Sequence, residues 1–473
     1  MNGSPISGRG DIPRIAQPPT EIDAAAWTAA AAGDATATTP SIRRILLASF
    51  IGTTIEWYDF FIYGTAAALV FNRLFFPSVN PFLGTLASFA TFTVGFVARP
   101  FGAVVFGHFG DRLGRKSMLI YSLLIMGIAT FLIGMLPTYE TAGMWAPIIL
   151  VLMRVAQGIG IGGEWGGAVL LAIEHSAPGK RGFAGSWPEM GGSAGLLLST
   201  LVFAVVTGNL TDEQFAAWGW RLPFLLSVVL IGVGLWIRLH VPETPAFAKV
   251  KARRVELERP IVGVVRDYGK NLLLAMGMRI AQNALFYIVT VFVLSYAQSK
   301  LNISRSTVLT GETISAAIGL FAVPFFGALS DRVGRKTVYL SGALFAFCYA
   351  LPFFWLLNTQ STLVIWLAII LGMNLGHDCM HGPQAAYFSE LFGTQVRYSG
   401  ISVAYQLTSI LGGGLAPLIS FALLETWGYP TVAAYVMTLC AITATATFIA
   451  PETYRRDLDD IQMNRASIDV ARP

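Results

Sequence analysis

Twelve apolar runs follow one another along this chain, from about residue 42 to about residue 450. An α-helix needs about 20 residues to cross the roughly 30 Å of hydrocarbon in a bilayer, and each run is long enough. Because lipid offers no partners to backbone N–H and C=O groups, such runs fold as helices. The pattern predicts an all-α membrane protein with twelve transmembrane helices, at roughly residues 42–70, 82–107, 117–137, 146–172, 183–208, 221–241, 270–298, 307–329, 337–357, 362–389, 398–423 and 430–450.

Charged residues are scarce, and the basic ones lie mostly in short segments between the runs. Only 12% of the 473 residues are charged and 54% are hydrophobic, whereas soluble proteins carry about 25% charged residues. The net charge is +5, but its placement in short loops indicates membrane topology rather than nucleic-acid binding. We therefore expect the lipid bilayer as a partner, and no nucleic acid.

One charged, glycine-bearing segment occurs twice, each time as a short turn between two apolar runs. It is Gly107–Lys116 after the second run and Gly327–Lys336 after the eighth. This recurrence indicates a duplicated unit, which is a common plan of secondary transporters. We expect two six-helix bundles with flanking tails, divided as a disordered tail 1–40, a bundle 41–241, a linker 242–269, a bundle 270–450 and a tail 451–473.

Other charges repeat in register with this motif. Glu174 and Arg181 between the fourth and fifth runs return as Glu390 and Arg397 between the tenth and eleventh. We interpret these charges as a cluster that closes one face of the bundle during conformational change; the alternative is that they only fix topology and solvate loops. The predicted gating residues are Gly107, Asp111, Arg112, Gly114, Arg115, Lys116, Glu174, Arg181, Asp331, Arg332, Arg335, Glu390 and Arg397.

The basic residues also predict an orientation. With a cytoplasmic amino terminus, most Lys and Arg fall on the cytoplasmic side, and only Arg73, Arg221, Lys300 and Arg305 fall outside. This positive-inside asymmetry predicts a multi-pass protein of the plasma membrane with both termini in the cytoplasm.

The repeated motif, Gly-x-x-x-Asp-Arg-x-Gly-Arg-Lys in its first copy, resembles the signature of the major facilitator superfamily, and Pro-Glu-Thr at 242–244 and 451–453 agrees. Further stretches resemble its metabolite:proton symporter family, in particular the shikimate-transporter-like branch. The resemblance covers about residues 42–455 and implies the major facilitator fold and a transporter, not an enzyme. The stretches are Glu56–Phe60, Arg99–Gly102, Arg154–Gly158, Gly382–Ala386 and Arg397–Gly400.

Ionisable residues inside the runs are informative, because a charge at the bilayer centre costs at least ~2.5 kcal/mol unless it faces a cavity or a partner. The first run holds Glu56 and Asp59, and the fourth holds Arg154 and Glu164. We interpret these four as the proton-coupling group, with Asp59 carrying the proton and Arg154 as counter-ion. In related sugar porters an acid in span one faces an arginine in span four, as the resemblance implies here. The alternative is a permanent structural ion pair.

Arg99 and Glu189 are further charged residues inside runs. Arg99, near one end of the second run, is expected to snorkel to the interface or to join helices. Glu189 follows Pro188 in the fifth run. It is either a second acid of the pathway or a protonated group in a helix contact.

The seventh run carries a polar stripe of Arg279, Asn283 and Tyr287 at four-residue spacing, which places the three on one helix face. A guanidinium can bind a carboxylate through two hydrogen bonds, so this stripe is our candidate for recognition of an organic anion. Tyr405 and Gln406 in the eleventh run are further candidate hydrogen-bonding partners. A structural polar stripe is the alternative.

The tenth run places Asn374, His377, Asp378 and His381 on one face. We interpret them as a cavity-facing cluster that serves the substrate or the proton. The spacing of the two histidines also imitates the His-Glu-x-x-His motif of zinc proteases, so a remote alternative is an intramembrane zinc metalloprotease. Because no third ligand is evident, we expect no metal site.

Gly158, Gly160 and Gly163 spell Gly-x-Gly-x-x-Gly, the pattern of a dinucleotide-binding loop. They follow no predicted strand, so we favour close helix packing over nucleotide binding as the explanation.

The function predicted from the sequence as a whole is proton-coupled symport of a small organic acid, shikimate-like or a di- or tricarboxylate, by alternating access. Uptake of zwitterionic osmolytes such as proline or a betaine is the alternative. Export, or facilitated transport without protons, stays open. We expect a monomer that needs no cofactor beyond the proton gradient.

Overall fold

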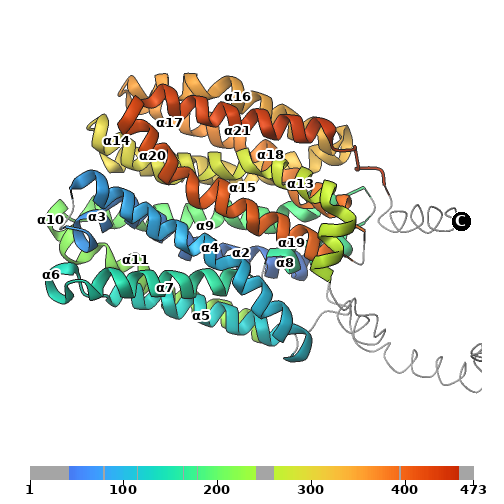
Figure 1. Ribbon diagram of the computed structural model, residues 1–473, viewed down its shortest axis with the longest axis horizontal. Helices are drawn as coiled ribbons and strands as arrows, with labels where there is room; N and C mark the ends of the chain where they lie inside the picture. Colours follow the sequence, from blue (N-terminus) through green and yellow to red (C-terminus); the bar gives the residue numbers. More distant parts are fainter. Residues whose placement is uncertain are drawn as a thin grey trace, which may run out of the picture. The chain divides into compact units, whose positions relative to one another are not determined.

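The computed structural model describes residues 42–77, 80–113, 115–162, 165–177, 179–240, 260–393 and 396–456. The predicted tail 1–40, the linker up to residue 259 and the residues after 456 lie outside this part. Within it each of the twelve predicted runs is helical, and no β-strand occurs among these residues (Figure 1). The all-α class is therefore confirmed, and the helices from α2 to α21 form one compact unit.

The first six runs correspond to α2 (Ile42–Leu69), α4 (Pro81–Leu113), α5 (Arg115–Met135), α7 (Trp145–Ile161) with α8 (Trp165–Glu174), α9 (Arg181–Asn209) and α11 (Arg221–His240). The other six correspond to α13 (Pro260–Tyr287) with η2 (Ile288–Phe292) and α14 (Val293–Lys300), α15 (Arg305–Val333), α16 (Arg335–Asn358), α17 (Thr362–Ile370) with η3 (Leu371–His377) and α18 (Asp378–Leu391), α19 (Arg397–Thr408) with η4 (Ser409–Gly414) and α20 (Leu415–Trp427), and α21 (Tyr429–Ile449). Short helices α3 (Phe71–Phe75), α6 (Tyr139–Ala142) and α10 (Asp212–Gln214) lie in connections.

Fewer than twelve of the described helices are, taken singly, both long enough and apolar enough to span a membrane. Ten in the described part are long and apolar enough, and an eleventh results if Asp212–Gly219 and Arg221–Trp236, which meet at 45°, count as one span. The third run gives only a shorter apolar helix, Ile120–Met135. The last part of the predicted linker, from Pro260 on, is helical, because α13 begins there and is kinked at Tyr268.

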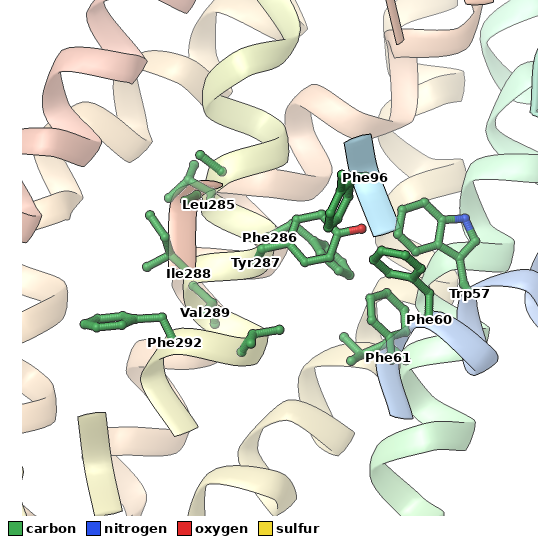
Figure 2. Close-up of a cluster of buried hydrophobic side chains, with 14 of the residues drawn as sticks. Trp57, Phe60, Phe61, Phe96, Leu285, Phe286, Tyr287, Ile288, Val289 and Phe292 are labelled. Carbon is green, nitrogen blue, oxygen red and sulfur yellow. The ribbon is translucent and has the colours of Figure 1, made fainter. Parts of the chain in front are cut away.

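Aromatic side chains join α2 and α4 to α13 in the centre of the molecule. Figure 2 shows Trp57, Phe60 and Phe61 of α2 directed toward Phe286 and neighbouring rings. The ring centroids of Phe61 and Phe286 are 5.1 Å apart, and those of Trp57 and Phe286 are 5.9 Å apart. Such tilted and edge-to-face pairs stabilise packing beyond simple burial. They hold segments of the first and second predicted halves together.

Small residues let neighbouring helices approach closely, as is common where lipid gives no hydrophobic drive for association. On α7, a Cβ added to Gly158 would overlap the carbonyl oxygen of Gly95 on α4. A Cβ on Gly160 would lie 3.0 Å from the Cβ of Met126 on α5. These two glycines therefore serve helix packing; Gly163 lies outside the described residues.

The variant Gly158→Ala is expected to be destabilised, because the added methyl group meets a backbone oxygen that cannot turn aside. Overpacking of this kind costs about 1–3 kcal/mol. The measurement is the melting temperature of the purified protein in detergent. The control is Gly167→Ala, whose added Cβ would meet open space. Equal melting temperatures for the two variants would contradict the packing explanation.

Candidate functional site

Asp59 on α2 is connected to Arg154 on α7 through two neutral side chains. Thr130 donates from Oγ1 to Asp59 Oδ2 at 3.1 Å, and Gln157 donates from Nε2 to Thr130 Oγ1 at 2.7 Å. Arg154 donates from Nη1 to Gln157 Oε1 at 3.0 Å. All four side chains are buried. Asp59 and Arg154, which are both described, form no direct ion pair. The predicted counter-ion relation between them is therefore indirect in this conformation.

Two buried guanidinium groups contact the same aromatic ring beside this chain of hydrogen bonds. The Cζ atoms of Arg154 and Arg99 lie 4.0 Å and 4.2 Å from the ring centroid of Phe60. Arg99 is only 2% exposed, so the expectation that it snorkels is wrong and the joining of helices is what remains. Gly95 leaves room for Arg154, since a Cβ there would overlap the guanidinium.

The other two predicted proton-coupling residues are Glu56 and Glu164, of which the structure describes only Glu56. Glu56 is buried on α2, with 5% of its surface exposed. It lies one turn from Asp59 on the same helix, as predicted. Glu164 lies outside the described residues.

A small cavity lies between α2, α9, α13, η3, α18 and α19, and polar and aromatic side chains line it. Several come from the predicted substrate group, and others were not singled out from the sequence. The lining residues are Trp57, Gly192, Arg279, Gln282, Asn283, Phe286, His377, His381 and Tyr405.

Arg279 is held at the edge of this cavity by contacts to α19 and η4. Its Nη1 donates to the carbonyl oxygen of Tyr405 and to Ser409 Oγ, both at 2.9 Å, and its Cζ lies 3.4 Å from the Tyr405 ring centroid. Its Nε has no hydrogen-bond partner among the described residues. The predicted stripe exists on α13, but only Arg279 and Asn283 line the cavity; Tyr287 is buried in the aromatic cluster.

The predicted cluster of the tenth run forms a hydrogen-bonded network on η3 and α18. Gln282 Nε2 lies 2.7 Å from His377 Nε2 and 3.2 Å from His381 Nδ1. His377 Nδ1 lies 2.8 Å from Asp378 Oδ1, and Asn374 donates from Nδ2 to Asp378 Oδ2 at 2.7 Å. The four predicted residues are thus brought together, and Gln282 is the partner that links the two histidines.

Glu189 connects this network to the first half of the chain. Its Oε2 on α9 lies 3.1 Å from His381 Nε2 on α18, and both side chains are buried. The sequence left two roles open for Glu189, a second acid of the pathway or a group in a helix contact. The structure shows the helix contact, in which Glu189 is paired with the titratable His381.

Gln406 does not line the cavity. It donates from Nε2 to the carbonyl oxygen of Gly162 at 2.9 Å, where α7 ends, and its Oε1 has no partner among the described residues. Its contact is with the backbone of another helix, which the residue type alone could not reveal.

Several site residues were missed from the sequence because they are neutral. Gln282 links His377 and His381, Thr130 links Asp59 to Gln157, and Trp57 forms one cavity wall. Amides, hydroxyls and indoles are common in membrane helices, so they carry no signal of the kind that a buried charge gives.

The second copy of the repeated motif forms a charge cluster at one end of the helices, here called the motif face. Arg335 makes ion pairs with Asp331 at 2.7 Å and with Glu390 at 3.3 Å. Asp331 Oδ1 and Oδ2 also accept hydrogen bonds from the backbone N–H groups of Gly182 and Phe183, both at 2.9 Å. The end of α15 is thereby fastened to the start of α9.

The other predicted gating residues have varied surroundings. Arg397 donates from Nε to the carbonyl oxygens of Ser389 and Phe392, and Arg181 donates to the carbonyl oxygen of Arg456 at 2.7 Å. Glu174 and Arg332 are exposed. The side chains of the first motif copy, Gly107, Asp111, Arg112, Gly114, Arg115 and Lys116, lie outside the described part.

At the opposite end, here called the far face, a second contact joins the two halves of the chain. Arg305 at the start of α15 pairs with Asp212 of α10 at 2.6 Å. Its Cζ lies 4.5 Å from the ring centroid of Phe215. The two halves of the chain are thus in contact at both faces in this conformation.

The model of the Major Facilitator Superfamily matches residues 45–417. The chain belongs to this superfamily. It is 42% identical over 417 residues to the shikimate transporter of Escherichia coli, covering 87% of this chain and 95% of that protein. It is 36% identical to the glycine betaine/proline/ectoine/pipecolic acid transporter OusA of Dickeya dadantii, covering 85% and 81%. The structure of the proton:xylose symporter XylE aligns with a TM-score of 0.71 at 17% identity, covering 89% and 98%.

These relatives confirm the predicted resemblance to metabolite symporters within the superfamily. The chain is a multi-pass membrane transporter and not an enzyme, so the zinc metalloprotease alternative is excluded. The spacing of His377 and His381 instead brings both imidazoles to the amide of Gln282.

Proposed function

We propose that the protein is a secondary active transporter that carries a small organic acid together with protons across the plasma membrane. The observation that carries the proposal is the buried Arg279, whose Nη1 is held by α19 and η4 while its Nε lacks a described partner beside the cavity. A carboxylate can take up a guanidinium edge of this kind through paired hydrogen bonds. The shikimate transporter among the relatives supports this substrate class.

Protons are proposed to bind at Asp59, with Glu56 nearby and Glu164 as a further member of the group. Asp59 Oδ1 has no partner among the described residues, while Oδ2 is linked through Thr130 and Gln157 to Arg154. This arrangement favours a proton carrier over a permanent ion pair, because a direct Arg154 contact would hold the carboxylate charged.

Asn283, His377 and His381 are proposed to contact the substrate, since they line the cavity with Arg279. Asn374 and Asp378 support them from behind through hydrogen bonds. Tyr287 and Gln406 are proposed to act through helix packing instead, because one lies in the aromatic cluster and the other contacts Gly162.

Alternating access is proposed to work between two six-helix halves, 41–241 and 270–450, joined by 242–269 and flanked by the tails 1–40 and 451–473. The motif face and both termini would lie in the cytoplasm, and the protein would act as a monomer without a cofactor. The contacts of Asp331 with α9 and of Arg305 with Asp212 would close the motif face and the far face in turn.

The variant Asp331→Asn is expected to favour opening at the motif face. It removes the charge that accepts two backbone N–H groups and pairs with Arg335, and each hydrogen bond to a charged group contributes about 1.5–3 kcal/mol. The measurement is the distance distribution between spin labels at Lys180 and Arg332. The control is Glu213→Gln on the far face; an unchanged distribution in Asp331→Asn would contradict the gating role.

A zwitterionic osmolyte such as proline or a betaine is the second candidate. The rings of Trp57, Phe286 and Tyr405 line the cavity and could enclose an ammonium group by cation–π contacts. Glu189 lies next to that wall through His381. The relative OusA, whose name includes glycine betaine and proline, supports this class.

A ligand screen on purified protein tests the two classes directly. A ligand that binds the native state raises the melting temperature. We expect shikimate, or a di- or tricarboxylate, to stabilise the protein more than glycine betaine or proline. The ligands that stabilise are then tested as labelled substrates in liposomes with an imposed pH gradient. Stabilisation by betaines alone would replace the organic-acid proposal with the second candidate.

A further inference from the structure

Glu312 on α15 is a buried carboxyl group that has no role in the function proposed above. It is 1% exposed, and neither Oε1 nor Oε2 has a hydrogen-bond partner among the described residues. It makes no ion pair within the described part either. No motif surrounds it in the sequence, although it lies inside the eighth apolar run.

The residues around Glu312 on α15 contact α9, η3 and α18. Gly319 lies two helical turns further along nearly the same line of α15, and its added Cβ would lie 2.8 Å from Ser193 Oγ and 3.3 Å from Asp378 Oδ2. The next residue, Thr313, donates to Thr200 of α9 at 3.0 Å. This surface joins the two proposed halves, so it must separate when the transporter opens.

The network on η3 and α18 begins one turn away from Glu312. Ser315 donates from Oγ to Asn374 Oδ1 at 3.1 Å, and Asn374 contacts Asp378, which pairs with His377. Side chains three residues apart on a helix are neighbours, with about 5–6 Å between their Cβ atoms. Glu312 therefore lies at the end of a polar path that leads to the central cavity.

None of the charged groups described on the elements packed against α15 balances Glu312. Glu189 on α9 pairs with His381, Asp378 pairs with His377, and Lys300 on α14 pairs with Glu425. Arg335 and Glu390 pair with each other at the motif face, and α17 contributes no charged residue. Arg279 donates to Tyr405 and Ser409 across the cavity.

An ionised carboxylate at this position would lack both a counter-ion and a donor, and burial penalises such a charge far more than the neutral acid. We propose that Glu312 is a second proton-carrying acid of the transporter. It binds a proton from one side when α9 and α15 separate there, and the same proton leaves to the other side when the opposite face opens. The proposal rests on the proton-coupled function above, with Asp59 as the first carrier.

Transport of a monoanion such as shikimate then moves two protons and one net positive charge. A membrane potential of 100 mV, negative inside, contributes ~2.3 kcal/mol for that charge, which is about fiftyfold in accumulation. In liposomes with a potassium diffusion potential, labelled shikimate uptake by the wild type is expected to respond to the potential. In Glu312→Gln the response disappears while uptake driven by a pH gradient remains.

Two variants control this experiment. Glu312→Asp restores a carboxyl group and is expected to restore the response to potential, and Glu425→Gln, on a partly exposed acid, is expected to leave it unchanged. Potential-independent uptake by the wild type, or an undiminished response in Glu312→Gln, would overturn the proposal. A wild type that takes up no shikimate would instead reject the proposed substrate.

Infrared spectroscopy of the purified protein tests the proton on Glu312 without any substrate. A buried protonated carboxyl group gives a C=O band separate from the carboxylate and amide bands. Glu312→Gln is expected to remove one such band at neutral pH, whereas Glu425→Gln, which replaces an ion-paired carboxylate, is expected to leave the bands of protonated carboxyl groups unchanged. Identical bands in the wild type and in Glu312→Gln would overturn the assignment even if transport were as proposed.

Discussion

Replacing Asp59 by asparagine is expected to reduce shikimate accumulation driven by a pH gradient by about tenfold for each pH unit, which is the contribution of one proton. Asparagine keeps the size and the contact to Thr130 but cannot bind and release a proton. Exchange of labelled for unlabelled shikimate, which needs no net proton movement, is expected to continue. The measurement is uptake and exchange in the same liposome preparation.

The control for this experiment is Glu425→Gln, which neutralises an acid paired with Lys300 and is expected to accumulate shikimate like the wild type. Loss of both exchange and accumulation in Asp59→Asn would indicate a structural role. Undiminished accumulation driven by the pH gradient would show that Asp59 carries no proton.

The largest effect on substrate affinity is expected from Arg279→Lys. A lysine ammonium is a point charge and cannot offer a carboxylate the paired donors of a guanidinium edge. It also loses the contacts to the Tyr405 carbonyl oxygen and to Ser409 Oγ. Hydrogen bonds to charged groups are worth about 1.5–3 kcal/mol, so the apparent affinity for shikimate should fall about 10–100-fold.

The matched variant is Ser409→Ala, which removes one positioning contact but keeps the guanidinium. Its effect on affinity is expected to be clearly smaller than that of Arg279→Lys. Concentration-dependent exchange measures both. An unchanged affinity in Arg279→Lys, with folded protein recovered, would count against direct recognition of the carboxylate and would favour the zwitterion alternative.

Charges in apolar runs were enough to locate much of the candidate site. Asp59, Arg154, Arg279 and the His377–His381 segment are all buried, as their cost in lipid requires. Glu312 is a charge inside an apolar run as well, and its burial without a hydrogen-bond partner among the described residues is what singles it out in the structure. Gln406 shows the limit of residue type as a guide, since its amide contacts the backbone of Gly162.

The all-α membrane class and the superfamily follow from the sequence alone, because apolar runs and short charged turns are local properties of the chain. The helix positions follow from it as well, apart from the start of α13 at Pro260. Which polar groups meet is a property of the tertiary packing. Thr130 and Gln157 stand between Asp59 and Arg154, and Glu189 reaches His381 from another half of the chain. Hydrogen bonds between helices depend on rotation and crossing angle, which the periodicity of a single helix does not contain.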